Sequence, residues 1–310
     1  MNVINDLNQI KKPLKNPVLS IGNFDGVHKG HLILFDKVKE IASSINGQSV
    51  VMTFEPHPIK VVKPGNGPSL ITPTDQKLKL ISDAGIDVII CIPFTMQFAS
   101  ISAEDFVRDI LVELIGVSEI VVGYDYTFGN SRRGDIDLLR NMGKESGFKV
   151  HVIEPIQLNH TLVSSTSIRK FIREGNLTEA KRLLGRDYQI SGVVGKGAGR
   201  GGKIVGFPTA NLTPVDELIP KKGVYAVTAE VDDRSYYGLC NIGTNPTFGG
   251  NTLSIETHLL DFHEDTLGKK FTIKFIHRLR EEILFNSLGE LTEQITKDIE
   301  QTRELFGLHG

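Results

Sequence analysis

The sequence predicts a two-domain protein, with an α/β domain in its N-terminal half and a mostly-β barrel in its C-terminal half. As far as about residue 185, amphipathic stretches separate short apolar runs at 18–21, 50–54, 88–92, 120–122 and 150–153. Buried strands that alternate with helices are typical of a doubly wound parallel sheet, which binds ligands at the carboxyl ends of its strands. Beyond residue 187, strand patterns follow one another with few helices between them, which indicates a small antiparallel barrel.

The helices of the first half are predicted from the spacing of their apolar residues. Positions 34, 38, 41 and 45 lie on one face of a helix that follows residue 31. Ser102 and Asp105 resemble a capping box, which predicts that a helix opens there and continues over 106–115.

In the second half, the predicted strands cover residues 189–194, 225–231, 236–242, 253–260 and 271–275. A turn-rich piece lies at 245–251, and a C-terminal helix is predicted over 288–306. A helical run stops at Gly185, and we therefore predict the domains 1–185 and 186–310.

Composition and charge exclude several classes of protein. The chain has 310 residues, 40% hydrophobic and 23% charged, which is a globular composition with room for two domains. The net charge of −2 argues against broad nucleic-acid binding. The chain opens without a signal-peptide pattern and no apolar run reaches about 18 residues, so no membrane partner is expected. Cys91 and Cys240 form no CxxC pair, which predicts a cytoplasmic protein without a disulfide framework or zinc site.

A glycine-rich segment with two histidines, residues 22–31, joins the first predicted strand to the first predicted helix. In a doubly wound sheet, that position presents helix amides and the helix dipole to an anion. Small residues such as Gly22 let the backbone approach a phosphate closely. His28 and His31 are three residues apart, so both rings can project from one turn toward the same phosphate. The alternative is a glycine-rich turn with two solvated histidines.

A second polar segment opens the helix that follows the fifth predicted strand. Hydroxyl residues such as Ser165 and Thr166 at a helix start usually cap the helix. Arg169 follows within one turn, so hydroxyls, free amides and a guanidinium converge, which suits the phosphates of ATP. The alternative is a capped helix whose arginine pairs with a surface carboxylate.

Together these segments resemble the FMN adenylyltransferase module of prokaryotic bifunctional riboflavin kinase/FAD synthetases. The resemblance rests on 22–31, 54–58, 122–129 and 164–169, and it covers residues 15–185. It implies that His28 and His31 are catalytic and contact the ATP phosphates and the transition state. It further implies an ATP site made of Gly22, Phe24, His28, His31, Ser165, Thr166 and Arg169.

The same resemblance implies a flavin-binding side. Asp125 lies in a Gly-x-Asp-x-x-Phe-Gly turn, and the resemblance implies that it is near the flavin phosphate or the catalytic centre. The alternative is that Asp125 only forms an Asx turn. Phe54 and His57 belong to a proline-flanked turn that can form without a ligand. Arg132 and Arg133 are interpreted as solvated surface residues.

Residues 192–206 hold seven glycines. By accident they match the dinucleotide-binding fingerprint and come within one residue of the P-loop pattern. Ile204 stands where a P-loop has Ser or Thr, and no helix follows as a dinucleotide-binding fingerprint requires, so both interpretations are rejected. We predict instead a flap that closes over ATP phosphates and includes Gly197 and Lys203. The alternative is a loop with ordinary surface cations.

The sequence that follows resembles riboflavin kinases. GFPTANL at 206–212 matches their defining motif, 241–247 and 255–262 agree with later motifs, and the resemblance spans 187–306. It implies that Thr209 and Asn211 bind Mg²⁺ and ATP phosphate, since magnesium accepts hydroxyl and amide oxygens. It also implies that Glu256 contacts the flavin and is the general base for its 5′-hydroxyl. The flap is one residue longer than the usual bacterial form and resembles that of eukaryotic kinases.

Two reactions are therefore expected, with ATP and Mg²⁺ required in both. The C-terminal domain phosphorylates riboflavin to FMN, and the N-terminal domain adenylylates FMN to FAD with release of pyrophosphate. Two alternatives stay open: a nucleotidyltransferase that acts on another phosphate ester, and a flavin-sensing regulator without turnover. The expected partners are small molecules, and the sequence does not predict an oligomeric state.

Overall fold

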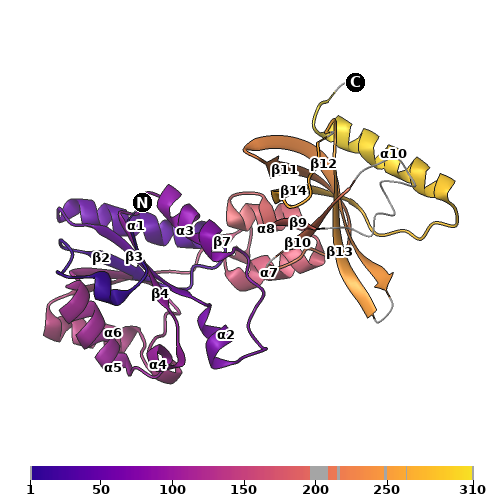
Figure 1. The fold of residues 1–310 in the computed structure, drawn as a ribbon. Helices are drawn as coiled ribbons and strands as arrows, with labels where there is room; N and C mark the ends of the chain where they lie inside the picture. The colour runs from indigo at the N-terminus through magenta and orange to yellow at the C-terminus, as the bar shows by residue number, and fades with distance from the viewer. Residues whose placement is uncertain (1, 196–208, 215–216, 248–249, 263, 309–310) are drawn as a thin grey trace. The chain divides into compact units, whose positions relative to one another are not determined.

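The computed structural model describes residues 2–195, 209–214, 217–247, 250–262 and 264–308 (Figure 1). The predicted Gly197 and Lys203 lie outside these ranges. Contacts between Cα atoms divide the chain into two compact units, Met1–Ser165 and Thr166–Gly310, and each is described by itself. Across the described residues, none of the helices combines the length and the apolar character needed to cross a membrane.

The first unit is built on a six-stranded sheet in the order β1-β4-β3-β2-β5-β6. All neighbouring strands pair in parallel, which confirms the predicted doubly wound sheet. Strand order reverses at β2, between β3 and β5, and such a switch point is where open α/β sheets bind ligands. The strands are β1 (Asn2–Ile4), β2 (Val18–Ile21), β3 (Ser49–Glu55), β4 (Val88–Pro93), β5 (Glu119–Gly123) and β6 (Lys149–Ile153).

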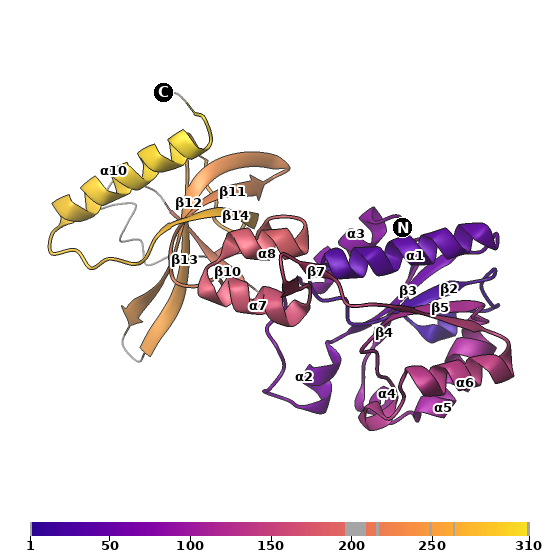
Figure 2. The same cartoon turned by 180° about the vertical axis from the view of Figure 1, so that it is seen from behind.

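Helices cover both faces of this sheet (Figures 1 and 2). Alternate residues of one strand enter two different cores, because side chains of a strand point to opposite faces. Val18 of β2 packs with Phe35 and Ile81 of one helical layer, whereas Leu19 packs with Leu111 of the other. The main helices are α1 (Lys29–Ser44), α3 (Thr74–Asp83), η2 (Phe106–Ile115) and α6 (Ile136–Ser146).

The predicted helix over 106–115 is present, but it is wound as a π-helix. Ser102 caps the short helix before it by accepting a hydrogen bond from the Asp105 amide at 3.0 Å. The remaining short elements are η1 (Leu7–Gln9), α2 (Pro58–Val62), α4 (Met96–Ala99), α5 (Ala103–Asp105), η3 (Asn130–Arg132), β7 (Gln157–Leu158) and β8 (Thr161–Leu162).

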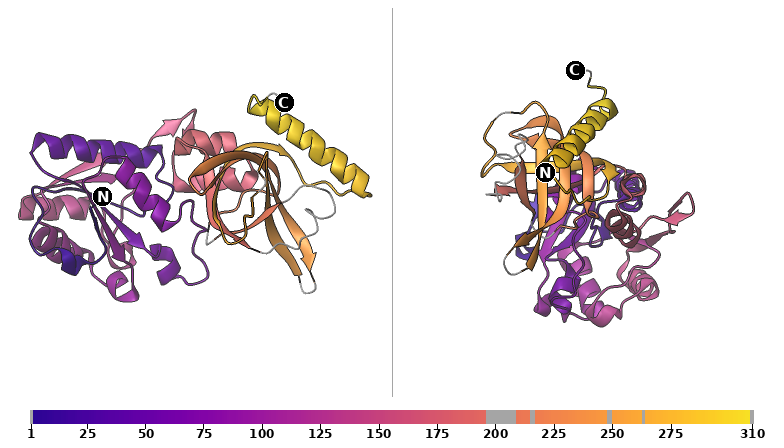
Figure 3. Two further views of the ribbon diagram at one scale, coloured as in Figure 1. Left: turned by 45° about the horizontal axis from the view of Figure 1, so that its top comes forward. Right: turned by 90° about the vertical axis from the view of Figure 1, so that its right-hand side faces the viewer.

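The second unit contains a closed antiparallel barrel in the order β10-β13-β12-β11-β14-β9, which confirms the predicted architecture (Figure 3). Helix α8 packs against β9 and β14, and α10 packs against β12. β12 and β13 continue into the piece that was predicted as a turn at 245–251. The elements are α7 (Ser165–Glu174), α8 (Leu177–Leu184), β9 (Tyr188–Gly195), β10 (Ala210–Pro214), β11 (Gly223–Val231), β12 (Arg234–Thr247), β13 (Gly250–Leu259), β14 (Lys270–Arg280) and α10 (Leu288–Leu305).

The helical run before the barrel ends at Gly185, as the sequence predicts. Gly185 adopts the left-handed φ of 81°, which is the usual C-terminal conformation for a glycine. The contact-based division falls earlier, after Ser165, and groups α8 with the barrel on which it packs. The domain boundary at 185/186 therefore stays a prediction.

A buried carboxylate, Glu217, ties the chain after β10 to β9. Its side chain is 7% exposed, and both carboxylate oxygens accept the Ser191 amide hydrogen, at 3.1 and 2.9 Å. Burial raises the pKa of Glu217 to about 7, although the hydrogen bond from Ser191 and the charge of Lys270 oppose the shift. Between its usual pKa of 4.5 and this value, the folded protein holds a proton that the unfolded chain has released.

We expect the contribution of Glu217 to the stability of the wild-type protein to be lost as the pH rises from about 4.5 to about 7. The loss reaches about 3 kcal/mol, because each unit of pKa shift corresponds to about 1.4 kcal/mol. Glu217→Gln keeps an oxygen for the Ser191 amide and carries no charge, so its stability changes less across this range. Urea unfolding followed by circular dichroism, at about pH 5 and about pH 8, measures the difference.

Glu230→Gln is the matched control for this experiment. Glu230 also lies on the barrel, but its side chain is 46% exposed and pairs with Lys274. It should keep the pH dependence of the wild type. Equal pH dependence in Glu217→Gln and wild type would contradict the role given to Glu217.

Candidate active sites

The loop between β2 and α1 holds the first candidate site. Phe24, Gly26 and Val27 all have positive φ, at 48°, 90° and 36°, so the chain turns sharply there. The Asp25 carboxylate is 4% exposed and accepts the amide hydrogens of Ile71 and Thr72. These bonds hold a strained loop in one conformation at the carboxyl end of the central strand.

His28 and His31 form a reciprocal capping box at the start of α1. The His31 amide donates to His28 Nδ1 at 3.3 Å, and the His28 amide donates to His31 Nδ1 at 3.4 Å. Because each Nδ1 accepts, a neutral ring must carry its hydrogen on Nε2. The two rings stack with centroids 3.5 Å apart, so the structure brings together two N–H donors.

Glycines make this close packing possible. A Cβ on Gly30 would lie 3.1 Å from the His28 ring, and one on Gly22 would lie 3.0 Å from the Phe24 ring. The Phe24 side chain is 3% exposed and contacts the His31 ring edge-on, with centroids 5.1 Å apart. Phe24 therefore supports His31 from the core, and its predicted contact with ATP stays a prediction.

The predicted Ser165, Thr166 and Arg169 divide between the two units. Ser165 is the last residue of the first unit, and its hydroxyl donates to the carbonyl oxygen of Asp25 in the histidine loop at 2.8 Å. Thr166 is exposed and Arg169 is half-buried on the first turn of α7, in the second unit. Their role at the histidines stays a prediction.

The flavin-binding residues predicted for the N-terminal half occupy the same edge of the sheet as this loop. Phe54 lies on β3 and Asp125 follows β5, and both strands neighbour β2. His57 is 8% exposed and caps α2, since its Nδ1 accepts the Ile59 amide hydrogen at 3.2 Å. Asp125 is exposed in the turn that the Tyr126 amide closes on the Gly123 carbonyl oxygen.

The sequence analysis missed two aromatic residues beside Phe54. Its ring centroid lies 5.5 Å from that of Phe94 and 5.8 Å from that of Phe98, and all three rings are half-buried. Aromatic rings in such groups offer flat apolar faces. The signal in the sequence was the position of Phe94, directly after β4, at the same carboxyl edge.

The second candidate site is a row of polar residues across the barrel. Strand register pairs Asn211 of β10 with Glu256 of β13, and Glu256 with Asn241 of β12. Their chain neighbours Leu212 and Ile255 are buried, so the row lies on the opposite face of the strands. The Ser254 hydroxyl donates to Glu256 Oε1 at 2.7 Å, which orients the carboxylate.

The donor set around this row suits magnesium. Thr209 directly precedes β10 and Asn211 lies on it, so the Thr209 hydroxyl and the Asn211 amide come from one short stretch of chain. Both supply hard oxygen atoms, and magnesium usually combines few protein ligands with water and phosphate oxygens. The residues present therefore fit the ion.

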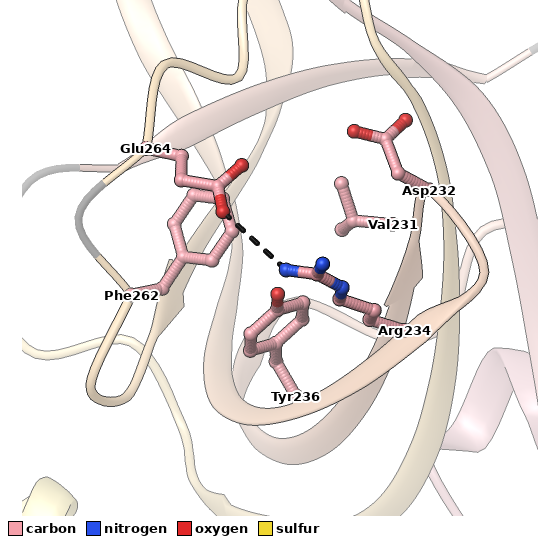
Figure 4. A pocket seen from close by; sticks show the side chains of 6 residues that line it. All are labelled: Val231, Asp232, Arg234, Tyr236, Phe262 and Glu264. Carbon is pink, nitrogen blue, oxygen red and sulfur yellow. Dashed lines mark ion pairs between the residues drawn. The ribbon is translucent and has the colours of Figure 1, made fainter.

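A cavity of about 200 Å³ lies between the β11–β12 hairpin and the segment that follows β13 (Figure 4). Arg234 and Glu264 form an ion pair across it at 3.8 Å. None of the predicted site residues lines this cavity, which is formed by Val231, Asp232, Arg234, Tyr236, Phe262 and Glu264.

The two units carry two different candidate sites on two different folds, and the comparisons with known proteins match a different enzyme domain to each half of the chain. The family model for FAD synthetase matches residues 10–167, and the family model for riboflavin kinase matches residues 184–306. The chain belongs to the family of bifunctional riboflavin kinase/FMN adenylyltransferases.

Relatives with that name match along almost all of their length. The protein of Escherichia coli is 36% identical over 310 residues, which cover 99% of both chains. The protein of Listeria monocytogenes is 38% identical over 94% of this chain and 93% of its own. A crystal structure described as a macrolide-efflux protein from Streptococcus pneumoniae superposes with a TM-score of 0.86 at 31% identity, and covers 97% of this chain and 98% of its own.

The capping box predicts how substitutions of His28 affect stability. His28→Ala removes the side chain that accepts the His31 amide, and we expect unfolding to become about 1 kcal/mol easier. Asn is a preferred N-cap residue, so His28→Asn should restore most of that loss. Urea unfolding of both variants tests this, and equal destabilisation by Ala and Asn would contradict a capping role.

Proposed function

We propose that this protein phosphorylates riboflavin to FMN in its C-terminal half and adenylylates FMN to FAD in its N-terminal half, with ATP as the second substrate in both steps. One observation carries the proposal: models of the two enzyme domains match the chain one after the other. The proposed domains are 1–185 and 186–310.

In the N-terminal half, a phosphate oxygen of FMN attacks the α-phosphorus of ATP. A new P–O bond forms, the bond to the β-phosphate oxygen breaks, and pyrophosphate leaves. The Nε2–H groups of His28 and His31 donate to phosphate oxygens on which negative charge increases. Such donors accelerate the step when they are already in place, and stacking and capping hold these two rings in position.

The remaining predicted residues divide this site into two sides. Amides beside Gly22 and the Ser165, Thr166 and Arg169 groups bind the triphosphate. Phe54 and His57 line the flavin, with Asp125 near its phosphate. The aromatic neighbours Phe94 and Phe98 extend the apolar surface that a flavin ring requires.

In the C-terminal half, Glu256 accepts the proton of the riboflavin 5′-hydroxyl as that oxygen bonds to the γ-phosphorus of ATP and ADP leaves. The hydrogen bond from Ser254 supports this role because it fixes one carboxylate oxygen. Thr209 and Asn211 would hold Mg²⁺, which neutralises phosphate charge when bound. Gly197 and Lys203 are assigned to the flap over the phosphates.

Two further parts of the proposal concern the setting of the reaction. Cys91 and Cys240 are unpaired and buried, which supports a cytoplasmic location. The partners are small molecules rather than nucleic acid, because the net charge is −2 and the polar groups above suit single phosphate esters.

His28→Asn tests the N-terminal assignment. This variant keeps the cap of α1 but has no imidazole donor, so we expect the conversion of FMN to FAD to fall by about 100-fold or more. Conversion of riboflavin to FMN should stay at the wild-type rate. Chromatographic analysis of the products formed from each flavin with ATP and Mg²⁺ measures both. Normal FAD formation would show that the site is misplaced.

Glu256→Gln tests the C-terminal assignment and serves as the reciprocal control. We expect riboflavin phosphorylation to fall by about 100-fold or more, because the amide cannot accept the proton. Conversion of added FMN to FAD should not change. Formation of FMN at the wild-type rate would rule out Glu256 as the base. Flavin binding without conversion by the wild-type protein would instead favour the regulator.

A further inference from the structure

Residues 71–77, here called the connecting segment, link the two sides of the N-terminal site. At its beginning, the Ile71 and Thr72 amides donate to the Asp25 carboxylate at 3.0 Å. The Gly26 amide donates to Thr72 Oγ1 at 3.1 Å. The segment therefore holds the loop that carries the two histidines.

The other end of the connecting segment holds the end of β3. The Thr74 hydroxyl donates to the Glu55 carboxylate. Lys77 Nζ donates to the Phe54 carbonyl oxygen at 3.0 Å. One short piece of chain thus fixes both the phosphate side and the flavin side of the site.

Lys77 is an unusual lysine because its side chain is buried. The residue is 6% exposed, whereas the Lys79 side chain on the same helix is 74% exposed and pairs with Asp83. Burial lowers the pKa of Lys77, and the nearby Cys91, Glu55 and Asp25 oppose that shift. Burying an ammonium group is costly. Packing alone does not require an amine at this position. The Phe54 carbonyl oxygen at the end of β3 requires a hydrogen-bond donor, and the Lys77 side chain supplies it.

We propose that Lys77 is a positioning residue for the flavin substrate: its ammonium group holds the Phe54 carbonyl, and through it the Phe54–His57 turn, at a fixed place relative to the histidine loop. This inference rests on the proposed adenylylation of FMN in the N-terminal half. Small displacements of substrate-positioning groups slow a reaction strongly, because the reacting atoms lose their alignment.

Lys77→Met in the full chain is the direct test. Methionine fills a similar volume but cannot donate to Phe54. We expect KM for FMN to rise about tenfold, because the Phe54–His57 turn is no longer held in place for the flavin. KM for ATP should change less than about twofold, because the histidine loop keeps its own bonds to Ile71 and Thr72. Lys77→Arg retains a charged donor and should recover part of the FMN affinity.

Two further variants keep the test decisive. Lys79→Met removes an exposed lysine from the same helix and should leave both KM values unchanged. Thr74→Val removes the other bond to β3 with little change in volume, and it should also raise KM for FMN selectively. If Lys77→Met does not fold, Thr74→Val decides the question.

The outcomes separate this inference from the proposed function. An unchanged KM for FMN in the folded variants, or an equal rise in KM for FMN and ATP, would overturn the positioning role. No recovery in Lys77→Arg together with a lower folded fraction would also overturn it in favour of a purely structural lysine. Absence of FAD synthesis by the wild-type protein would instead overturn the proposed adenylylation.

Discussion

The N-terminal site depends on a buried carboxylate, that of Asp25. A charge with 4% exposure needs hydrogen-bond donors, and the backbone amides of Ile71 and Thr72 supply them. The loop around Asp25 is thereby held with three residues at positive φ, and it places His28 at the N-cap position of α1. The capping box, the stacked rings and the contact with Ser165 all follow from this one arrangement.

The two halves arrange the polar groups of their candidate sites in different ways. In the parallel sheet, a loop at the strand switch point joins the free amides of a helix start to two imidazole donors. In the barrel, strand register aligns Asn211, Glu256 and Asn241 across three strands. Under the proposed function, the first arrangement would supply donors to the phosphate oxygens during adenylyl transfer. The second would supply a carboxylate that accepts a proton, with oxygen atoms for a cation.

The sequence predicted both architectures because strand–helix alternation and strand-rich patterning are carried by side chains along the whole chain. It missed β1, which has only three residues, and β10, whose short alternation of apolar and polar residues lies between the glycine-rich run and Pro214. It predicted the helix over 106–115 but not its π-winding, which depends on backbone bonds rather than on apolar spacing. The sequence also predicted that His28 and His31 lie on one turn at the start of a helix, and the structure has them there. Lys77 stayed hidden because its partner, Phe54, is 23 residues away and bonds through its backbone.

The central claim is that each half transfers a different part of ATP to the flavin. Incubation of riboflavin with Mg²⁺ and ATP labelled in either the γ- or the α-phosphate tests it directly. The account predicts that the γ-label enters FMN and then FAD, whereas the α-label enters FAD alone. An α-label that never reaches a flavin would contradict the adenylyl transfer, and FMN without the γ-label would contradict the kinase.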